Sequence, residues 1–415
     1  MDCTPVFRKV ARSSRVLRTI SDSVISKALI TISEKIVEAI PVIIEANKKD
    51  LSRMDKDDPR YDRLLLSPER IISISSDIRN VVSMPDPTGR TLSEKSLPNG
   101  LLISRTSVPF GVIGVIFEAR PNVVIDVFSL CLKSRNACVL KGGTDARDSN
   151  EALVTIIKES LKAAGIDEEV LALLPPGREE TIQLLNAREY IDLVIPRGSR
   201  GLIDFVRENA RVPVIETGAG ICHTYFDRAG DRDKGRVIVN NAKTRRVSVC
   251  NALDCLVIHR ERLSDLWYLV ELCASSSVII FADEDSYEAL REKYPEELLK
   301  HADRDSFGTE FLSYKMAVKT VASIEEAMDH IEQFGSKHSE AIISEDINSV
   351  NLFLITVDAS AVYANTSTAF TDGSEFGLGA EIGISTQKLH ARGPMALEEL
   401  TTYKWIIRGN GQIRK

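Results

Sequence analysis

The chain has 415 residues, of which 43% are hydrophobic and 27% charged, and its formal net charge is −7. This length predicts two large domains with smaller appendages. No basic tract with interleaved aromatics is present, as a nucleic-acid binder would show, and no window approaches 18 uninterrupted apolar residues, so neither nucleic acid nor a membrane is an expected partner. The seven cysteines are scattered without zinc spacing, which indicates reduced thiols in a cytoplasmic protein.

The first hundred residues divide into a helical part and a loop. Residues 14–50 carry apolar side chains at helical spacing, among them Leu17, Ile20 and Val24, and this period predicts helix. Residues 84–100 contain MPDPTGR and LPNG, and such proline- and glycine-rich segments predict a loop that leads into a strand.

From residue 108 onward, continuous apolar strands alternate with amphipathic helices. This alternation predicts a doubly wound parallel sheet with both faces covered, and ligands of such sheets bind beyond the carboxyl ends of the strands. The segments are, in order, VPFGVIGVIF, DVFSLCLKS, NACVLKGG, NEALVTIIKESLKAAG, VLALLPP, EETIQLLNA, IDLVIPRGS, RGLIDFVREN and VPVIETG.

Two predicted strand ends carry residues suited to a nucleotide. Lys141 and Gly142 follow the strand CVL, and Gly198 with Ser199 follows LVIP. The chain lacks the GxGxxG fingerprint common in dinucleotide-binding proteins. Taken alone, both segments are equally well interpreted as plain turns.

Cys250, in VSVCNALDC, is the candidate nucleophile. Three cations precede it, Lys243, Arg245 and Arg246, and nearby positive charge lowers the pKa of a thiol and makes it nucleophilic at neutral pH. The alternative is a small buried residue, which is what most cysteines are. Cys255, inside the apolar run CLVIH, is interpreted as a core residue.

The order of these motifs resembles a known family. In sequence, PFGVIGVIFEARPN, NACVLKGG, LLPPG, VIPRGS, VIETGAG, the Cys250 segment and DSFGTEF resemble the successive motifs of the aldehyde dehydrogenase superfamily. More narrowly, the chain resembles the gamma-glutamyl phosphate reductase family, or glutamate-5-semialdehyde dehydrogenases, in FEARPN, SLCLKSRNACVLKGG, GICH, KTRRVSVCNALD, FTDGSEFGLGAEIGISTQKLHARGP and LTTYKW. Residues 321–342 match that family's signature, with Phe334 where His or Tyr is expected.

The resemblance implies the second step of proline biosynthesis: reduction of L-glutamyl 5-phosphate by NADPH to glutamate 5-semialdehyde, with release of phosphate. The thiolate of Cys250 would attack the acyl phosphate, and hydride would reduce the resulting thioester. Charge develops on the carbonyl oxygen in both steps and needs prepositioned donors. The candidates are the backbone N–H of Cys250 and the side chain of Asn251 or Asn122, although an ungapped count from Lys141 places Glu118 at the superfamily's asparagine. Asn122 is equally well read as an ordinary turn residue.

The cofactor residues implied by the resemblance lie at the strand ends and in DSFG. Lys141, with Gly142 beside it, matches the lysine at the adenosine ribose, and its ammonium can pair with a 2′-phosphate, which favours NADP. Gly198 and Ser199 match the pair that lets a helix N-terminus approach the pyrophosphate. Asp305 and Phe307 resemble the acid and aromatic at the nicotinamide, and Glu310 with Phe311 is a rival placement.

The two anionic groups of the substrate call for guanidinium groups, which bind such oxygens bidentately. Arg120 and Arg246 are the leading candidates and Arg392 is the third, and the alternative for each is an ordinary surface arginine. Two residues depart from the family pattern: Ala369 stands where arginine is expected, and Val247 stands where proline is expected.

Glu216 lies where hydrolytic aldehyde dehydrogenases place their general base, so a hydrolytic enzyme acting on a small aldehyde is the alternative function. A catalytically dead scaffold is a third hypothesis, which the joint presence of Cys250 and the cofactor residues disfavours. His330 and His338 are eight residues apart with no third ligand near them in sequence, so no metal site is expected.

The expected architecture is an aldehyde dehydrogenase-like α/β fold in three parts. Residues 1–100 and 108–235 would form the NADP-binding domain, 236–380 the catalytic domain, and 101–107 with 393–415 a bridging element. An extended C-terminal strand in a separate element usually pairs with another subunit, so a homo-oligomer, dimer or tetramer, is expected. The resemblance further implies functional coupling to glutamate 5-kinase.

Overall fold

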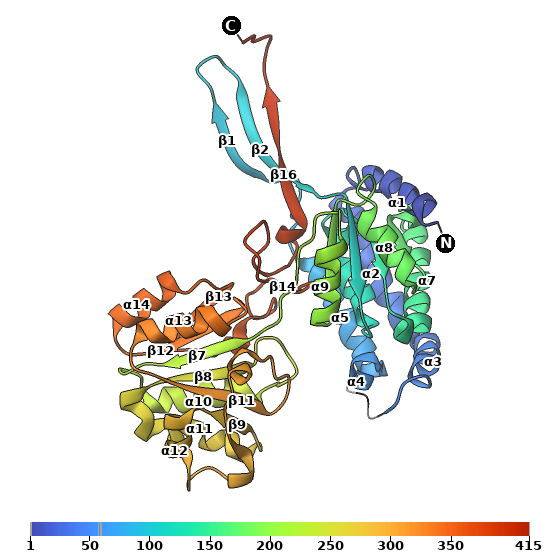
Figure 1. Cartoon of the computed structure of the whole chain (residues 1–415). Helices are drawn as coiled ribbons and strands as arrows, with labels where there is room; N and C mark the ends of the chain where they lie inside the picture. Colours follow the sequence, from blue (N-terminus) through green and yellow to red (C-terminus); the bar gives the residue numbers. More distant parts are fainter. Residues whose placement is uncertain (1, 57, 59, 415) are drawn as a thin grey trace. The chain divides into compact units, whose positions relative to one another are not determined.

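The computed structural model of the chain describes residues 2–56, 58 and 60–414. The chain forms two compact units (Figure 1). Residues 1–217, 377–383 and 394–415 make the first unit, and residues 218–376 and 384–393 make the second. The expected boundary at 235/236 is therefore displaced to 217/218, because β7 (Cys222–Phe226) pairs with β8 (Leu253–His259) and β12 (Ser339–Ile343) of the second unit.

The core of the first unit is a parallel sheet of four strands in the order β5-β4-β3-β6. Every residue of its two central strands is buried, which is why both read as continuous apolar runs. The strands are β3 (Val112–Phe117), β4 (Ala137–Lys141), β5 (Leu171–Leu173) and β6 (Leu193–Arg197). The segment VPVIETG, which was expected to be a further strand, contributes only a single bridge from Val214 to Val194.

The helical start of the chain is divided into three helices. A new helix begins after Ser21, which has extended backbone at the N-cap, and another begins beside Pro41, because proline lacks the N–H that an interior helical position needs. The helices of the first unit are α1 (Thr4–Leu17), α2 (Asp22–Glu38), α3 (Ile40–Leu51), α4 (Tyr61–Leu64), α5 (Pro68–Ser83), α6 (Asn122–Lys133), α7 (Arg147–Ala163), α8 (Arg178–Asn186) and α9 (Arg200–Asn209).

The first unit also carries a separate antiparallel sheet of three strands in the order β1-β2-β16. It consists of β1 (Thr91–Ser96), β2 (Leu102–Pro109) and the C-terminal β16 (Thr401–Arg408), which extend together as a hairpin and a third strand (Figure 1). The expected single strand VPFGVIGVIF is broken at Gly111, whose φ of +135° favours glycine, so its two halves join different sheets.

The second unit is built on a parallel sheet of seven strands in the order β10-β9-β11-β8-β7-β12-β13. The remaining strands are β9 (Ile279–Ala282), β10 (Leu299–His301), β11 (Lys315–Val321) and β13 (Ala361–Ala364). A short sheet of two strands is formed by β14 (Ile384–Ser385) and β15 (Gly393–Pro394).

Helices cover both faces of the seven-stranded sheet (Figure 1). One face packs against α10 (Arg232–Thr244), α11 (Leu266–Ser275) and α12 (Glu284–Leu290). The other face packs against α13 (Ile324–Phe334) and α14 (Ile347–Thr356). Each unit is thus an α/β layer structure, as the alternating sequence pattern predicts.

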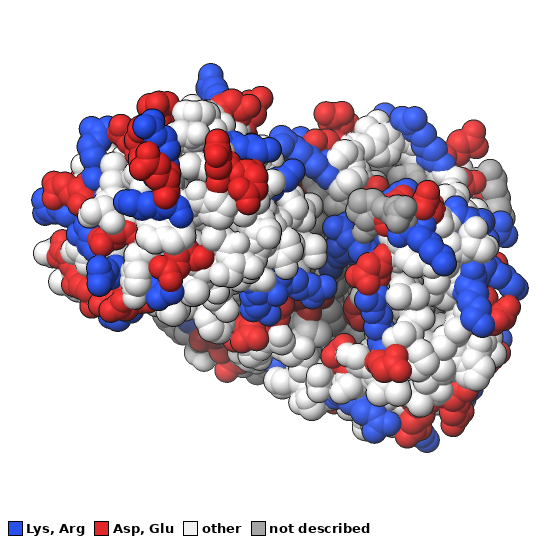
Figure 2. All heavy atoms as spheres, turned by 90° about the horizontal axis from the view of Figure 1, so that it is seen from below, with Lys and Arg blue, Asp and Glu red and all other residues white. Residues whose placement is uncertain are grey.

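In the part of the chain that the structure describes, no helix combines the length and the apolar character needed to cross a membrane. Lys and Arg are interspersed with Asp and Glu over the face shown in Figure 2. This distribution agrees with the small net charge of −7.

Candidate active site

Cys250 lies in the turn between α10 and β8, where it is partly buried. Gly220 packs directly against this turn, because a Cβ at Gly220 would overlap the carbonyl group of Cys250. The thiol of Cys222, the first residue of β7, donates a hydrogen bond to the same carbonyl over 3.1 Å. Gly220 and Cys222 therefore both hold the backbone from which the Cys250 side chain projects.

A buried polar network lies behind this turn. Burial raises the pKa of the Cys222 thiol, which keeps it protonated and able to donate. His338 Nδ1 lies 3.8 Å from the Cys222 sulfur and 2.8 Å from Ser339 Oγ, and burial lowers the pKa of His338 to about 4. Ser339 Oγ in turn lies 2.6 Å from Thr371 Oγ1. His338 is therefore a neutral support of the nucleophile turn.

Asn251 braces the turn and is poorly placed to stabilise an oxyanion. Its amide nitrogen donates to the carbonyls of Ala369 over 3.3 Å and Thr371 over 3.0 Å, and Thr368 Oγ1 donates to the carbonyl of Asn251 over 2.8 Å. Both amide protons are thus used within the fold. This arrangement disfavours Asn251 as an oxyanion donor.

The cations before Cys250 do not all face the thiol. The Lys243 ammonium is fully buried, donates to the carbonyl of Leu253 over 2.8 Å and lies 3.7 Å from Asp254. Burial lowers the pKa of Lys243 and raises that of Asp254 to about 7. Arg245 and Arg246 are exposed, so these two arginines remain as the nearby positive charges.

The structure favours Glu310 and Phe311 over Asp305 and Phe307 as the acid and aromatic pair. Glu310 Oε1 accepts a hydrogen bond of 2.9 Å from the backbone N–H of Gly220, the residue in contact with the Cys250 carbonyl. Asp305 and Phe307 lie in the 3₁₀ turn Asp305–Gly308.

The ring of Phe307 packs against α13, with its centre 5.3 Å from that of His330 and 5.8 Å from that of Phe334. Phe311 stacks on Phe281 with 5.5 Å between ring centres. Asp305 with Phe307 and Glu310 with Phe311 both remain candidates, and the hydrogen bond from Gly220 to Glu310 favours the second pair.

In the first unit, Lys141 ends β4 with its side chain buried. Its ammonium donates to the carbonyl of Gly142 over 3.0 Å, and burial lowers its pKa. Gly142 is required at its position, because a Cβ there would overlap the side chain of Asn150 and crowd Phe117. A cation at the carboxyl end of a parallel strand is suitably placed for an anionic ligand.

The N-terminus of α9 offers backbone donors that a carboxylate already uses. Ser199 caps this helix, and its backbone N–H donates to Glu118 Oε2 over 2.7 Å, while its hydroxyl lies 3.2 Å from Glu118 Oε1. A Cβ at Gly198 would also collide with that carboxylate. The Glu118 side chain, which is exposed, therefore stands where a pyrophosphate would meet the helix.

Arg120 and Asn122 flank the start of α6. Arg120 is partly buried in the loop after β3, and its neighbour Ala119 has a φ of +30°, a conformation uncommon for a residue with a side chain. Asn122 Nδ2 donates to Asp126 Oδ2 over 2.8 Å within the same helix, and burial raises the pKa of Asp126 to about 6. One amide proton of Asn122 remains for another acceptor.

Arg392 is committed to an ion pair. It donates to Asp358 over 2.7 Å, and Lys388 and Lys337 approach the same carboxylate at 2.7 and 3.3 Å. Hydrogen bonds from these cations hold the pKa of Asp358 well below its usual range. This cluster accounts for Arg392 structurally and disfavours it as a substrate ligand.

Glu216 is paired with an arginine. Its carboxylate lies 3.6 Å from Arg207 of α9, within the first unit. This geometry disfavours a role for Glu216 in activating water.

The sequence interpretation missed a buried cluster in the second unit. His223 from β7, Cys255 from β8 and His330 from α13 converge, with one ligand atom of each within 4.8 Å of the others. GICH marked His223 as part of a family motif, but no local pattern links three segments so far apart in sequence. Cys255 is buried as expected, in an apolar cluster, and its sulfur also lies 3.7 Å from His330 Nε2.

The chain was compared with known proteins. No protein-family model matches it. It is 59% identical over 414 residues to gamma-glutamyl phosphate reductase from Parabacteroides distasonis, and the match covers 100% of both chains. The crystal structure of gamma-glutamyl phosphate reductase from Thermotoga maritima is 38% identical, with a TM-score of 0.96 and 100% of both chains covered.

An acetylating aldehyde dehydrogenase from Geobacillus thermoglucosidasius is 15% identical, with a TM-score of 0.70 over 99% of this chain and 97% of that one. At this identity the likeness shows the fold alone. The chain is thus an oxidoreductase with the aldehyde dehydrogenase fold. Its full-length identity of 59% shows that it belongs to the gamma-glutamyl phosphate reductase family. The fold and the family indicated by the sequence motifs are both confirmed.

Proposed function

We propose that this chain reduces L-glutamyl 5-phosphate with NADPH to L-glutamate 5-semialdehyde and releases phosphate, the second step of proline biosynthesis from glutamate. The observation that carries the proposal is the identity of 59%, over the full length, to a relative named gamma-glutamyl phosphate reductase. Cys250 supplies the thiol that this chemistry requires, in a turn braced from both sides.

In the proposed mechanism the Cys250 thiolate adds to the carbonyl carbon of the acyl phosphate. The tetrahedral species expels phosphate and leaves a thioester on the sulfur. Hydride from NADPH reduces the thioester to a thiohemiacetal, which releases the aldehyde and regenerates the thiol after protonation. The acyl phosphate is already activated, so no step needs a base that activates water.

The oxyanion formed in both steps needs donors. With both amide protons of Asn251 engaged, the backbone N–H of Cys250 is the first candidate and the free amide proton of Asn122 the second. Substrate anions are assigned to Arg120 and Arg246, since Arg392 is held by Asp358.

The first unit is proposed to bind the cofactor. Lys141 would pair with the 2′-phosphate of NADPH, next to Gly142, and Gly198 with Ser199 would receive the pyrophosphate at the N-terminus of α9. Within the second unit, the acid and aromatic proposed for the nicotinamide are Glu310 with Phe311 or Asp305 with Phe307. A preference for NADP rests on the ammonium of Lys141, because only a 2′-phosphate offers it a charged partner.

The sheet formed by β1, β2 and β16 is proposed to join copies of the chain, as a dimer or tetramer. Exposed apolar side chains on β16 support this role: Tyr403 is 50% exposed, and Trp405 and Ile407 are each 55% exposed. We further propose that the chain acts in the cytoplasm and receives its labile acyl phosphate from glutamate 5-kinase.

A steady-state assay of the reverse reaction tests the proposed function. Glutamate 5-semialdehyde and NADP are mixed with the protein, with and without inorganic phosphate, and NADPH is followed. The proposal predicts NADPH formation that requires phosphate, because the thioester can be discharged only by phosphate. Sustained turnover without phosphate would instead identify the hydrolytic aldehyde dehydrogenase.

A further inference from the structure

Three ligand-type side chains that the proposed function does not use meet inside the second unit. His223, Cys255 and His330 are 0%, 0% and 7% exposed, and one ligand atom of each lies within 4.8 Å of the others. We propose that these three side chains form a binding site for a thiophilic transition-metal ion such as Zn²⁺. No step of the proposed reaction depends on this site.

One pair of ligand atoms already has the spacing of tetrahedral coordination. The Cys255 sulfur lies within hydrogen-bond distance of His330 Nε2, at 3.7 Å. A Zn–S bond of about 2.3 Å and a Zn–N bond of about 2.0–2.1 Å, at the tetrahedral angle, place the two ligand atoms about 3.6 Å apart. The ligand atoms of the three residues lie within 4.8 Å of one another, so the widest pair would draw closer when an ion binds.

His223 has the orientation of a metal ligand. Its Nδ1 lies 3.1 Å from Glu340 Oε2, and its backbone N–H donates to the same oxygen over 2.8 Å. Its other ring nitrogen, Nε2, is buried and has no hydrogen-bond partner among the described residues. Metal-binding histidines commonly donate their second nitrogen to a carboxylate in this way, which fixes the tautomer and turns the free nitrogen to the ion.

Binding of an ion needs deprotonated ligands. Metal coordination takes a thiolate and neutral imidazoles, so an ion bound by Cys255, His223 and His330 displaces the thiol proton.

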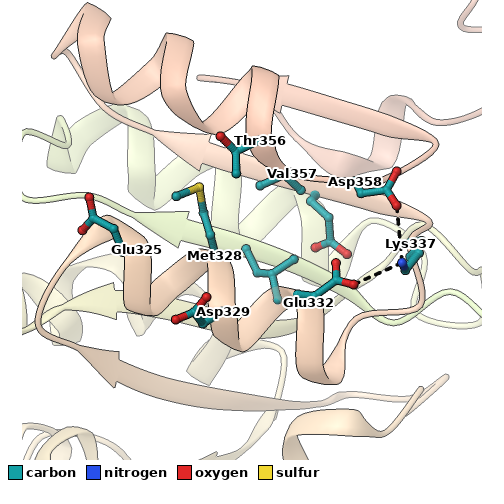
Figure 3. Close-up of a pocket in the computed structure, with 10 residues that line it drawn as sticks. Glu325, Met328, Asp329, Glu332, Lys337, Thr356, Val357 and Asp358 are labelled. Carbon is teal, nitrogen blue, oxygen red and sulfur yellow. Dashed lines mark hydrogen bonds and ion pairs between the residues drawn. The ribbon is translucent and has the colours of Figure 1, made fainter.

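An acidic cavity adjoins the proposed site. Glu340, the partner of His223, also lines a cavity of about 300 Å³ beside α13 (Figure 3). Figure 3 shows the carboxylates of Glu325, Asp329, Glu332 and Asp358 around it, with Lys337 bonded to two of them.

A bound ion would tie together β7, β8 and α13 on one face of the seven-stranded sheet. These elements are joined in this region mainly by the apolar cluster around Cys255 and Ile331. Any ligand that binds only the folded state stabilises it, by an amount that grows with the logarithm of the ligand concentration over its dissociation constant. The expected consequence is a higher melting temperature with metal, independent of substrate or cofactor.

Metal binding by the full-length chain, carrying no histidine tag, tests the proposal. The protein is produced with added Zn²⁺ or Co²⁺, passed through a desalting column, and its metal content measured. We expect about one ion per chain. The Co²⁺ form is expected to show a thiolate-to-metal charge-transfer band, because a cysteine sulfur is in the ligand set, and chelator is expected to lower the melting temperature.

Variants identify the ligands. Cys255→Ser should abolish the charge-transfer band, His330→Gln should remove most of the metal, and Glu340→Gln should weaken binding by about 10- to 100-fold. Cys273→Ser is the matched control, because Cys273 is equally buried but packs on the opposite face of the sheet. The proposal is overturned if the wild-type chain retains no metal or shows no thiolate band, or if Cys255→Ser keeps the band. The wild-type result decides even if a variant does not fold.

Discussion

The sulfur of Cys250 is the atom on which the proposed reaction depends, because it carries the acyl group between loss of phosphate and hydride transfer. Cys250→Ala should lower kcat by about 10³-fold or more, the scale at which loss of a covalent nucleophile is measured elsewhere. NADPH binding, measured by fluorescence titration, should be unchanged. Cys273→Ala serves as the control and should retain activity, because Cys273 is buried in α11. Equal loss in both variants would contradict the assignment.

Lys141 is the residue assigned to the cofactor 2′-phosphate. Lys141→Ala should weaken NADPH binding about 10- to 100-fold, because it removes a charge-assisted contact of about 1.5 to 3 kcal/mol. It should weaken NADH binding far less. Dissociation constants for both cofactors give the comparison. Equal losses would mean that Lys141 contacts only the ribose hydroxyls that the two share.

The pH dependence of this preference follows from the burial of Lys141. Burial lowers the pKa of its ammonium, and only the protonated form attracts the 2′-phosphate. The preference for NADPH over NADH should therefore be largest while Lys141 is protonated and should decline as the pH rises through its pKa. Because that pKa is lowered, the decline should begin at a lower pH than for an exposed lysine. Titration of both cofactors across this range gives the profile.

Glu216 is expected to have no role as a base for water. Its ion pair with Arg207 and the need for the thioester to survive until hydride or phosphate arrives both argue against it. Glu216→Gln should keep phosphate-dependent oxidation of the semialdehyde within about tenfold of wild type, against the roughly 10²- to 10⁴-fold of a lost acid or base. A loss of the larger size, with turnover that needs no phosphate, would revive the hydrolytic alternative.

Among single residues, the sequence predicts those that lie in a recognisable local motif. Cys250, Lys141 and Ser199 each follow or precede a strand with distinctive neighbours, and they remain the candidates. The resemblance of DSFG to the superfamily motif favours Asp305, whereas the hydrogen bond from Gly220 favours Glu310, and no sequence pattern predicts that bond.

At the scale of elements, the N-terminus of α9 offers a test of the cofactor site. Glu118 accepts hydrogen bonds from the N–H and the hydroxyl of Ser199, the groups assigned to the pyrophosphate. Glu118→Gln removes the competing charge, so NADPH should bind about two- to fivefold more tightly, the range of a helix-terminus charge effect. Glu151→Gln, at an exposed site on α7, is the control for general loss of charge. Weaker binding in Glu118→Gln alone would show that Glu118 supports the site.

The sequence predicts a helix or strand correctly where the local residue pattern determines it. It fails where contacts with distant segments determine how the backbone continues. The buried strands β3 and β4 follow from their apolar runs. The break at Gly111 was missed, because the apolar pattern continues across it while the backbone turns into another sheet. The expected strand VPVIETG pairs at only one residue, Val214.

At the scale of the whole molecule, β16 is expected to mediate assembly. It is an edge strand, and alternate side chains Tyr403, Trp405 and Ile407 present an exposed apolar row. The double variant Trp405→Glu with Ile407→Glu should shift the protein to monomer in sedimentation velocity. The control variant Ile355→Glu should leave the assembly unchanged, because Ile355 is 85% exposed in α14, outside this sheet. An unaltered mass in the double variant would place the interface elsewhere.

The division into α/β units was predictable, because alternating strands and helices have few alternative packings. The position of the boundary was not, since the strand order that assigns β7 to the second sheet depends on pairing with β8 and β12, both distant in sequence. The convergence of His223, Cys255 and His330 was invisible for the same reason.

The most direct test of the account is to catch the acyl group on the enzyme. The protein is mixed with glutamate 5-semialdehyde and NADP in the absence of phosphate, quenched within the first turnover, and analysed by mass spectrometry. The account predicts a single burst of about one NADPH per chain, a glutamyl adduct on the peptide that contains Cys250, and its discharge when phosphate is added. Continuous NADPH formation without phosphate, or an adduct on another residue, would contradict it.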